Sequence, residues 1–444
     1  MIFGSFFTGI GGAETAIDMV AKSSKSECKT VFFCENAKNR YKILRKNFGA
    51  KPYTPEINDF EEDSIPIFPD IRMIKFDKAN NKIFYNVSKD KKKEEYKECK
   101  LNIDLSSIDC GFYSFPCQPF SIAGKQLSDQ DTNYLVDAVV DRAKELKTDI
   151  IICENVYGFV TLEMGLENWI KEMQNLGYNT EAVVLTSAGV GAPHKRERCF
   201  MIAYTDEIKK SMYAAPKSFN IPMQANPYIF NGRDVRNPGI EKMIIKRPSK
   251  LDIERLYATG NAINPFQIYP IIALVKHIVD YHKANPNQNI TVSTKHDQDS
   301  LSCSGPFVKR LMNLDIYKTK WNHGITDWDT CYTPIELYRV PIQTIKFNQE
   351  KGYSWSVTPV AWDRVALYRA GKLRKEVQNL SEEEKEEMED FIQNYFDEEI
   401  VSEDERPFRN PAWNEWLMGF PPGYTKVGGT DFDNIVIEDD EEPK

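Results

Sequence analysis

The chain lacks the features that mark membrane and secreted proteins. Its 444 residues contain no apolar run of about eighteen residues, the length that a membrane-spanning helix needs. The first five residues, Met1 to Ser5, carry no basic side chain, and no signal-peptide cleavage site follows them. The sequence therefore predicts a cytoplasmic protein with no membrane partner.

A metal-binding pattern is also absent. The nine cysteines are scattered without a CxxC pair, and the five histidines are not spaced with them as metal ligands would be. In a reducing compartment such cysteines are free thiols. We therefore expect free thiols and no metal site.

The chain has no excess of basic charge. Its formal net charge is −9, which argues against nonspecific coating of nucleic acid. A basic cleft is still compatible with that number, because local charge governs binding. Acidic residues are concentrated in residues 381–387 and 438–442. We interpret the first run as a solvated helix and residues 429–444 as a disordered acidic tail.

Short apolar segments alternate with helical segments over the first 200 residues. The strands are predicted at residues 2–7, 30–34, 150–153, 182–186 and 199–203, with helices near 14–20 and 39–47. This alternation predicts an α/β fold with a doubly wound, largely parallel sheet. In such sheets ligands bind at the carboxyl ends of the strands.

Changes in composition divide the chain into predicted domains. A main domain covers residues 1–282, with insertions at about 61–104 and 206–250. Residues 283–410 hold four tryptophans among short segments and predict a smaller, irregular α+β domain. Residues 411–428 are expected to return to the main domain, ahead of the acidic tail.

One cysteine stands in an unusual setting. Cys117 lies between Pro116 and Pro119, directly after the apolar run 108–114 that predicts a buried strand. A thiol held at a strand's carboxyl end by flanking prolines is typical of a nucleophile. A cysteine packed in a core is the alternative, and Cys117 alone does not decide between the two.

A glycine turn and an acidic residue point to a nucleotide-like cofactor. Gly9, Gly11 and Gly12 follow the first strand and open a helix, which allows a ligand close to the backbone and the helix amides. Glu35 ends the second strand, about 23 residues after Gly12, near the spacing of an acid that binds ribose hydroxyls. A solvent-facing acid is the alternative for Glu35.

Three further charged side chains are predicted at the same edge of the sheet. Glu154 follows the buried strand 150–153. Arg196 and Arg198 precede another strand, and they point the same way if that segment is extended. Two guanidinium groups on one face suit a phosphate or a carbonyl oxygen, although a solvated face is equally consistent.

In their order along the chain, these blocks resemble those of the cytosine-C5 DNA methyltransferases. The matching blocks are Ser5–Gly12, Cys34–Asn36, Phe115–Ser121, Glu154–Val156, Gly191–Arg198, Gly260–Pro265 and Trp416–Pro421. The last two stand in the reverse of the usual order. Residues 283–410, rather than the short stretch 206–250, are therefore expected to carry most of the target recognition.

The resemblance implies S-adenosylmethionine as the cofactor. The implied contacts are Phe7 and Asn36 with the adenine, Gly9 and Gly11 with the methionine portion, and Glu35 with the ribose hydroxyls. Asp59 is the candidate for the acid near the adenine amino group, with Asp70 and Asp104 as competitors. Asn261 would complete the pocket from a helix that folds back onto the first strands.

The resemblance also implies a chemistry. Addition of the Cys117 thiolate to C6 of cytosine places electron density on C5, while Glu154 hydrogen-bonds or protonates N3. Arg198 would hold the cytosine carbonyl oxygen, with Arg196 supporting it or contacting the backbone phosphate. The base must leave the stacked duplex for this reaction. Residues 118–132 are interpreted as the loop that closes over the flipped base.

The expected function is that of a DNA (cytosine-5)-methyltransferase acting on a specific short duplex sequence. A restriction–modification or phage setting is expected, with double-stranded DNA as partner and a cognate restriction endonuclease as a second candidate. We expect a monomer in the cytoplasm of a bacterium or of a phage's host. A tRNA cytosine-5 methyltransferase and a catalytically silent DNA-binding homologue stay open as alternatives.

Overall fold

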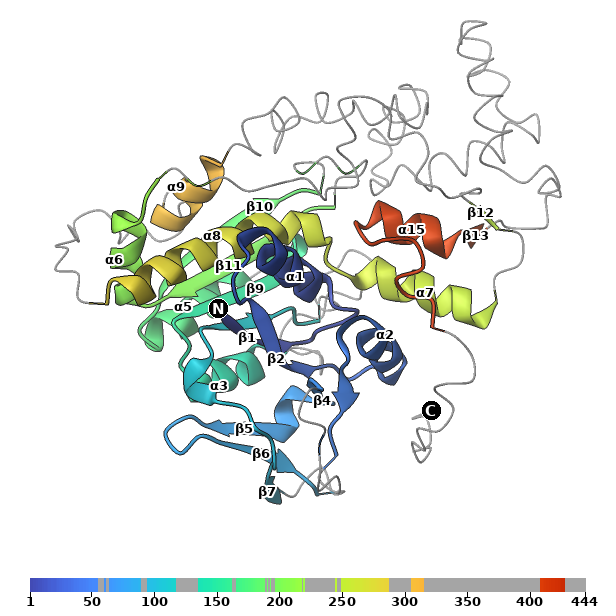
Figure 1. Ribbon diagram of the computed structural model, residues 1–444, viewed down its shortest axis with the longest axis horizontal. Helices are drawn as coiled ribbons and strands as arrows, with labels where there is room; N and C mark the ends of the chain where they lie inside the picture. The colour runs from blue at the N-terminus through green and yellow to red at the C-terminus, as the bar shows by residue number, and fades with distance from the viewer. Residues whose placement is uncertain are drawn as a thin grey trace, which may run out of the picture.

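The computed structural model describes residues 1–54, 60, 64–88, 94–116, 135–161, 165–187, 190, 192, 196–217, 219, 244–245, 249–286, 305–314 and 408–427. Its centre is an eight-stranded sheet in the order β10-β11-β9-β8-β1-β2-β4-β3 (Figure 1). The strands are β1 (Ile2–Phe6), β2 (Lys29–Cys34), β3 (Lys51–Pro52), β4 (Pro66–Phe68), β8 (Cys110–Tyr113), β9 (Ile150–Val156), β10 (Asn179–Leu185) and β11 (Arg198–Tyr204). Neighbouring strands are parallel, except that β11 is antiparallel to both β9 and β10.

The central strands are apolar because both faces of the sheet are covered. β1 and β8 are buried throughout, and β9 is buried up to its last residue. From β1 the chain builds outward through β2, and it later returns to place β8 on the other side of β1. Ligands in open α/β sheets bind at the carboxyl ends of strands next to such a reversal. The predicted doubly wound α/β fold is confirmed.

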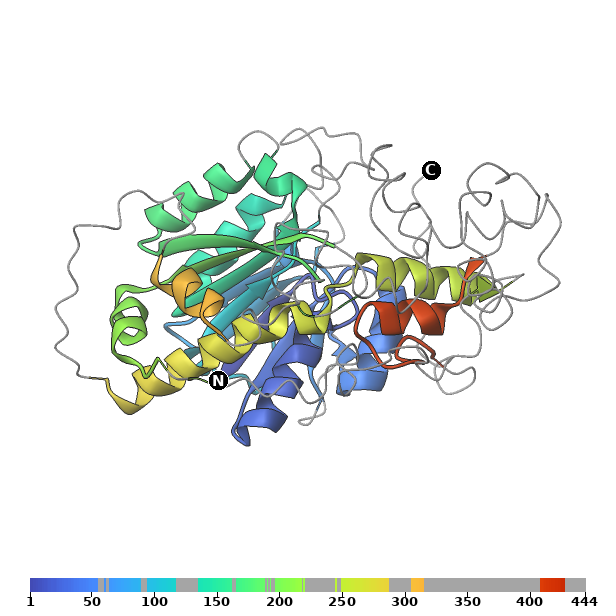
Figure 2. The same cartoon turned by 90° about the horizontal axis from the view of Figure 1, so that it is seen from above.

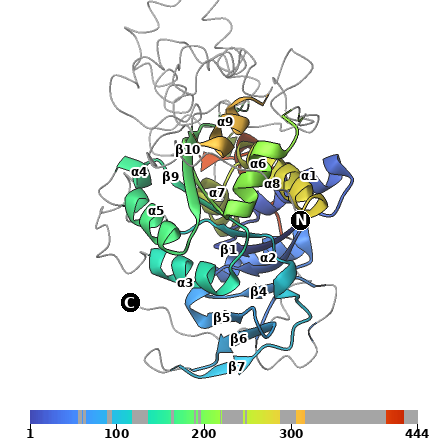
Figure 3. The same ribbon diagram turned by 90° about the vertical axis from the view of Figure 1, so that its left-hand side faces the viewer.

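Helices cover both faces of this sheet (Figures 2 and 3). One layer consists of α1 (Gly12–Ser24), α6 (Asp206–Ala214), α8 (Pro265–Ala284) and α9 (Pro306–Met312). The other layer consists of α3 (Val136–Leu146), α4 (Gly158–Thr161) and α5 (Gly165–Asn175). The start of α8 is fixed by the Asn264 side chain, which accepts a 3.0 Å hydrogen bond from the Phe266 amide, and by Pro265 in the first turn.

The range that was expected to be an insertion holds a separate small sheet. It contains β5 (Ile74–Asp77), β6 (Lys82–Asn86) and β7 (Tyr96–Glu98), all antiparallel, together with the 3-10 turns η1 (Ile71–Met73) and η2 (Leu105–Ser107). Arg142 of α3 attaches this sheet to the core, because its buried guanidinium donates to the carbonyls of Ile71, at 3.0 Å, and Ile74.

The carboxyl ends of β1 and β2 are flanked by helices from both ends of the chain (Figure 1). They are α2 (Lys38–Phe48), α7 (Lys250–Asn261) and α15 (Pro411–Leu417), with a two-residue ladder between β12 (Ile244–Ile245) and β13 (Phe408–Arg409). α7 begins with a capping box between Ser249 and Asp252, and α15 packs along α7. Residues separated by about 150 positions thus form one helix pair.

Most of the predicted domain 283–410 and the tail 429–444 lie outside the described residues, so these boundaries stay predictions. Within that range, α9 packs into the core of the main sheet through Phe307, Val308 and Leu311. Among the described helices, no single one is long and apolar enough to cross a membrane. The bent pair α7–α8 meets that measure only when both helices are counted together.

Candidate active site

A tight loop follows β1 and leads into α1; we call residues 7–12 the glycine loop. Phe7, Gly9 and Gly11 all have positive φ values, of 57°, 62° and 87°. A Cβ atom on Gly11 would lie 2.3 Å from the ring of Phe48, so glycine is required there. A Cβ atom on Gly9 would meet no atom within 4 Å among the described residues, which leaves open space in front of this residue.

Glu35 connects the ends of β1 and β2. Its carboxylate is only 3% exposed and accepts hydrogen bonds from the Gly9 amide at 2.7 Å, the Ala37 amide at 2.8 Å and the Arg40 guanidinium at 2.9 Å. A carboxylate has about four lone-pair sites, so these three bonds leave room for a ligand hydroxyl. The structure therefore joins the two parts of the predicted cofactor site, the glycine loop and Glu35.

A second carboxyl group lies beneath the glycine loop and was missed from the sequence. Glu14, in the first turn of α1, is 2% exposed and accepts a 2.5 Å hydrogen bond from the Ser5 hydroxyl of β1. Its other oxygen has no partner among the described residues. Burial raises the pKa of Glu14 from its ordinary value of 4.5 to about 7. In the sequence, the one indication that Glu14 is buried is its place beside the apolar face of the helix predicted near residues 14–20.

The remaining predicted cofactor residues take varied positions. Phe7 is half-buried and packs against the core beneath the small sheet, while Asn36 and Asn261 are exposed at the ends of β2 and α7. Asp59 lies outside the described residues. Both of its competitors serve local turns: Asp70 accepts from the Arg72 amide, and Asp104 from the Ser106 amide, each at 2.9 Å.

Glu154 and Arg198 meet at the carboxyl end of β9. The two strands β9 and β11 run antiparallel, and the Arg198 Nε atom lies 3.0 Å from Glu154 Oε1. The hydroxyl of Ser114, at the end of β8, donates to Glu154 Oε2 at 2.5 Å. Arg198 and Ser114 therefore hold both oxygens of the Glu154 carboxylate, and Glu154 is only 5% exposed. Ser114 was missed from the sequence, where its only signal is its place just before Phe115.

The described chain stops one residue short of Cys117. The residues just before Cys117 are held in place, because the buried Asn155 side chain donates to the Phe115 carbonyl at 3.5 Å. The Phe115 ring also packs edge-on against Phe159, with 5.3 Å between centroids. Cys117 itself lies outside the described residues. Pro116 is the last described residue before Cys117, and it follows the end of β8, where Ser114 bonds to Glu154.

Arg196 is directed elsewhere. Its Nη2 atom donates to the carbonyls of Gly260 at 2.8 Å and Ala262 at 2.6 Å, at the end of α7. Gln267 of α8 holds the backbone in place by donating to the Arg196 carbonyl at 2.9 Å. Arg196 has a φ of 38°, so the segment is not extended there, and the condition under which the two arginines would point the same way is not met. Arg196 instead braces the connection that carries Asn261.

These features agree with the comparison to known families. The family model for C-5 cytosine-specific DNA methylase matches residues 70–431. The chain belongs to this family. The matched range contains Glu154, Arg198 and the approach to Cys117.

Individual relatives match over part of their length. The chain is 26% identical over 232 residues to the type II methyltransferase M.NgoBI of Neisseria gonorrhoeae, covering 52% of this chain and 57% of that protein. It is 28% identical over 222 residues to the type II methyltransferase M.HhaI of Haemophilus parahaemolyticus, covering 49% and 54%. The chain thus spans about half the length of the curated relatives it matches. A methyltransferase of Entamoeba histolytica, EhMeth, shares 14% identity at a TM-score of 0.35, over 65% of this chain and 99% of that one. That likeness is too low to support an argument.

Proposed function

We propose that the protein is a DNA (cytosine-5)-methyltransferase that acts on cytosine in a short duplex sequence. The observation that carries this proposal is the Glu154 carboxylate, whose two oxygens are held by Arg198 and Ser114. It stands beside the strand end from which the chain continues to Cys117. A carboxylate, a guanidinium and a thiol are the groups that addition to a cytosine ring requires.

The residues around the glycine loop fit S-adenosylmethionine. The open space at Gly9 admits a ligand against the backbone, and Glu35, held by Gly9 and Arg40, retains acceptor capacity for ribose hydroxyls. The first amides of a helix lack intrahelical partners, so the start of α1 can donate to a carboxylate. When bound, this cofactor supplies an electrophilic methyl group. Phe7, Asn36, Asp59 and Asn261 stay proposals for the adenine end.

Each protein group has a defined task in the proposed reaction. The Cys117 thiolate adds to C6 of the base, and C5 then takes the methyl group from the sulfonium of the cofactor. Loss of the C5 proton to a base eliminates the Cys117 thiolate from C6 and restores the ring. Glu154 accepts a hydrogen bond from the base or shares a proton with N3, and its contact with Arg198 holds the carboxylate in place for the base. Arg198 also offers donors to the carbonyl oxygen of the base. Because a stacked base is out of reach, the cytosine must be flipped out of the duplex.

The names of the relatives support a proposal for the substrate and the cellular setting. M.NgoBI and M.HhaI are named type II methyltransferases. We therefore place this protein in a restriction–modification system or a phage, in the cytoplasm, as a monomer with double-stranded DNA and with a cognate endonuclease as a candidate partner. Residues 283–410 are the proposed recognition region.

A labelled-methyl assay tests the proposal. The purified chain is incubated with S-adenosylmethionine carrying a tritiated methyl group, and incorporation is compared between bacterial genomic DNA and bacterial tRNA. Incorporation into DNA, located at cytosine by bisulfite sequencing, is the expected result. Incorporation into tRNA alone would favour the RNA alternative. Binding to DNA without incorporation into either would favour a silent homologue.

A further inference from the structure

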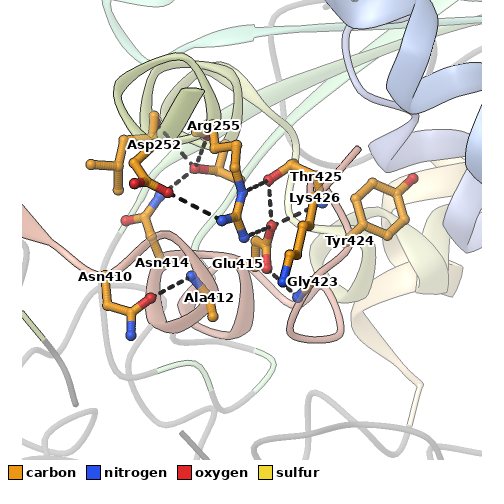
Figure 4. Close-up of polar contacts among 12 residues, drawn as sticks. Asp252, Arg255, Asn410, Ala412, Asn414, Glu415, Gly423, Tyr424, Thr425 and Lys426 are labelled. Atoms are coloured by element: carbon orange, nitrogen blue, oxygen red, sulfur yellow. Dashed lines mark hydrogen bonds and ion pairs between the residues drawn. The ribbon is translucent and has the colours of Figure 1, made fainter. Parts of the chain in front are cut away.

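The C-terminal segment, residues 408–427, is fixed to the main domain by a buried carboxylate. Glu415 of α15 is fully buried and accepts from Arg255 of α7 at 3.0 Å, from the Thr425 amide at 2.8 Å and from the Gly423 amide at 2.5 Å (Figure 4). The Thr425 hydroxyl also donates to it. Because Glu415 satisfies the backbone of the turn 423–425, it determines where Tyr424 lies.

Tyr424 reaches from this turn to the glycine loop, more than 400 positions away in the sequence. Its hydroxyl donates to the carbonyl of Ile10 at 2.8 Å and lies 3.1 Å from the hydroxyl of Thr15. The Thr15 hydroxyl in turn donates to the carbonyl of Gly11 at 2.8 Å. Tyr424 is buried, and its ring lies 4.5 Å from that of Phe420. Two consecutive carbonyls of the glycine loop are thus held by two hydroxyls that contact each other.

Fixing these carbonyls also fixes the amides that follow them. In a trans peptide the carbonyl and the next amide point in opposite directions. With the Gly11 carbonyl turned toward Thr15 and Tyr424, the Gly12 amide points away from them. Gly12 is the first residue of α1, where helix amides lack intrahelical partners and favour an anionic group.

A second anchor ties the turn to α2. The Nζ atom of Lys46 donates to the carbonyls of Gly423 at 2.6 Å and Lys426 at 2.9 Å. α2 starts three residues after Glu35, whose carboxylate binds the Gly9 amide. The C-terminal segment therefore contacts the helices that follow both halves of the proposed cofactor site.

We propose that Tyr424 is a positioning residue for the cofactor: its hydroxyl sets the orientation of the glycine loop that receives the methionine portion of S-adenosylmethionine. The inference rests on the proposed function, because it assumes that this cofactor occupies the loop. Tyr424 acts through the backbone of Ile10 and Gly11. Its loss weakens cofactor binding and leaves the chemical step unchanged.

The test uses two matched variants of the full chain, Tyr424→Phe and Tyr178→Phe. Tyr178 is also buried, and its hydroxyl also donates to a backbone carbonyl, that of Thr148 at 2.7 Å, but it lies at the opposite end of the sheet. Affinity for S-adenosylhomocysteine is measured by titration calorimetry, and KM for S-adenosylmethionine and kcat by labelled-methyl transfer. Tyr424→Phe is expected to weaken affinity and raise KM about three- to tenfold with kcat unchanged, the effect of one lost hydrogen bond. Tyr178→Phe is expected to leave both constants unchanged.

The possible results separate the two proposals. Equal affinity of Tyr424→Phe and the wild-type chain overturns the role of Tyr424, whereas a wild-type chain that binds no cofactor overturns the proposed function. Thr15→Ala removes the other hydroxyl and is expected to weaken binding as well. Because the two hydroxyls form one unit, the double variant should lose less than the product of the single effects. Thr15→Ala with unchanged affinity also counts against the proposal.

Discussion

The hydroxyl of Ser114 and the carboxylate of Glu154 are joined by a hydrogen bond of 2.5 Å between the ends of β8 and β9. Arg198 approaches the other oxygen of the same carboxylate. A carboxylate with both oxygens held has little rotational freedom, which lowers the cost of presenting it to a base. Ser114 therefore adds a positioning residue to the groups that the sequence blocks identify.

Replacement of this serine should slow the chemical step. Ser114→Ala removes one hydrogen bond to a charged group, and we expect kcat for methyl transfer to fall about tenfold with KM for the cofactor unchanged. Ser211→Ala on α6 is the matched control, since that buried hydroxyl donates to the Glu207 carbonyl of α6 and lies 3.0 Å from His282 Nδ1 of α8. Steady-state kinetics on a DNA substrate measure both. A kcat that falls equally in the control would show that Ser114 acts through stability alone.

The two arginines should differ in phenotype. Arg198→Lys loses the contact of Nε with Glu154, and we expect kcat to fall about a hundredfold, as for loss of a donor at a reacting group. Arg196→Lys loses one of its two carbonyl contacts at the end of α7, with a cost of about 1 kcal/mol in the free energy of unfolding. Its kcat should stay near the wild-type value. Kinetics and urea unfolding of both variants check this, and identical kcat losses would contradict the division of roles.

Much of the fold could be predicted because buried parallel strands are short apolar runs. β1, β2, β9, β10 and β11 were all expected within a few residues of their observed ends. Their directions could not be predicted, since the antiparallel β11 has the same apolar pattern as its parallel neighbours. The small sheet lies in residues 61–104, which were predicted only as an insertion, although β5 alternates buried Ile74 and Phe76 with less buried residues.

The site was predicted where its chemistry lies in contiguous motifs, and missed where it depends on distant contacts. Glu35 and Gly9, and Glu154 and Arg198, meet as expected. Arg196 departs because one positive φ value interrupts the alternation. Arg310 lies in the range 283–410 that was expected to recognise the target, and it donates to three carbonyls of residues 212–216. No local pattern distinguishes a guanidinium that binds a backbone from one that binds a phosphate.

The proposed nucleophile gives a direct test. Cys117→Ser should abolish methyl transfer and leave S-adenosylhomocysteine binding intact, because a serine hydroxyl is not ionised near neutral pH. The control is Cys99→Ser, since burial raises the pKa of the Cys99 thiol to about 11 and makes it unreactive. Trapping on DNA that contains 5-fluorocytosine, with adducts resolved by denaturing electrophoresis, should give a band for the wild type and the Cys99→Ser control. An adduct with Cys117→Ser would reject this cysteine as the nucleophile.

Glu14 should give the folded protein a distinct pH dependence. In the unfolded chain this carboxyl ionises near its ordinary pKa of 4.5, whereas burial in the folded protein raises its pKa to about 7. Below 4.5 it is protonated in both states; between 4.5 and 7 the unfolded chain releases the proton that the folded protein retains. Stability therefore falls as the pH rises through this window, by up to about 3 kcal/mol.

Glu14→Gln removes the titration, so the fall in stability between pH 5 and pH 7.5 should become smaller in this variant. The new amide nitrogen is buried without a partner, which lowers the free energy of unfolding of Glu14→Gln by the same amount at every pH. The test therefore compares how steeply the free energy of unfolding changes with pH. Urea unfolding at several pH values measures it. Glu27→Gln is the control, since Lys29 lowers the pKa of that exposed carboxyl and its titration lies below the window. If Glu14→Gln keeps the wild-type slope, the dependence arises elsewhere and the buried carboxyl beneath the glycine loop is ionised in the folded protein.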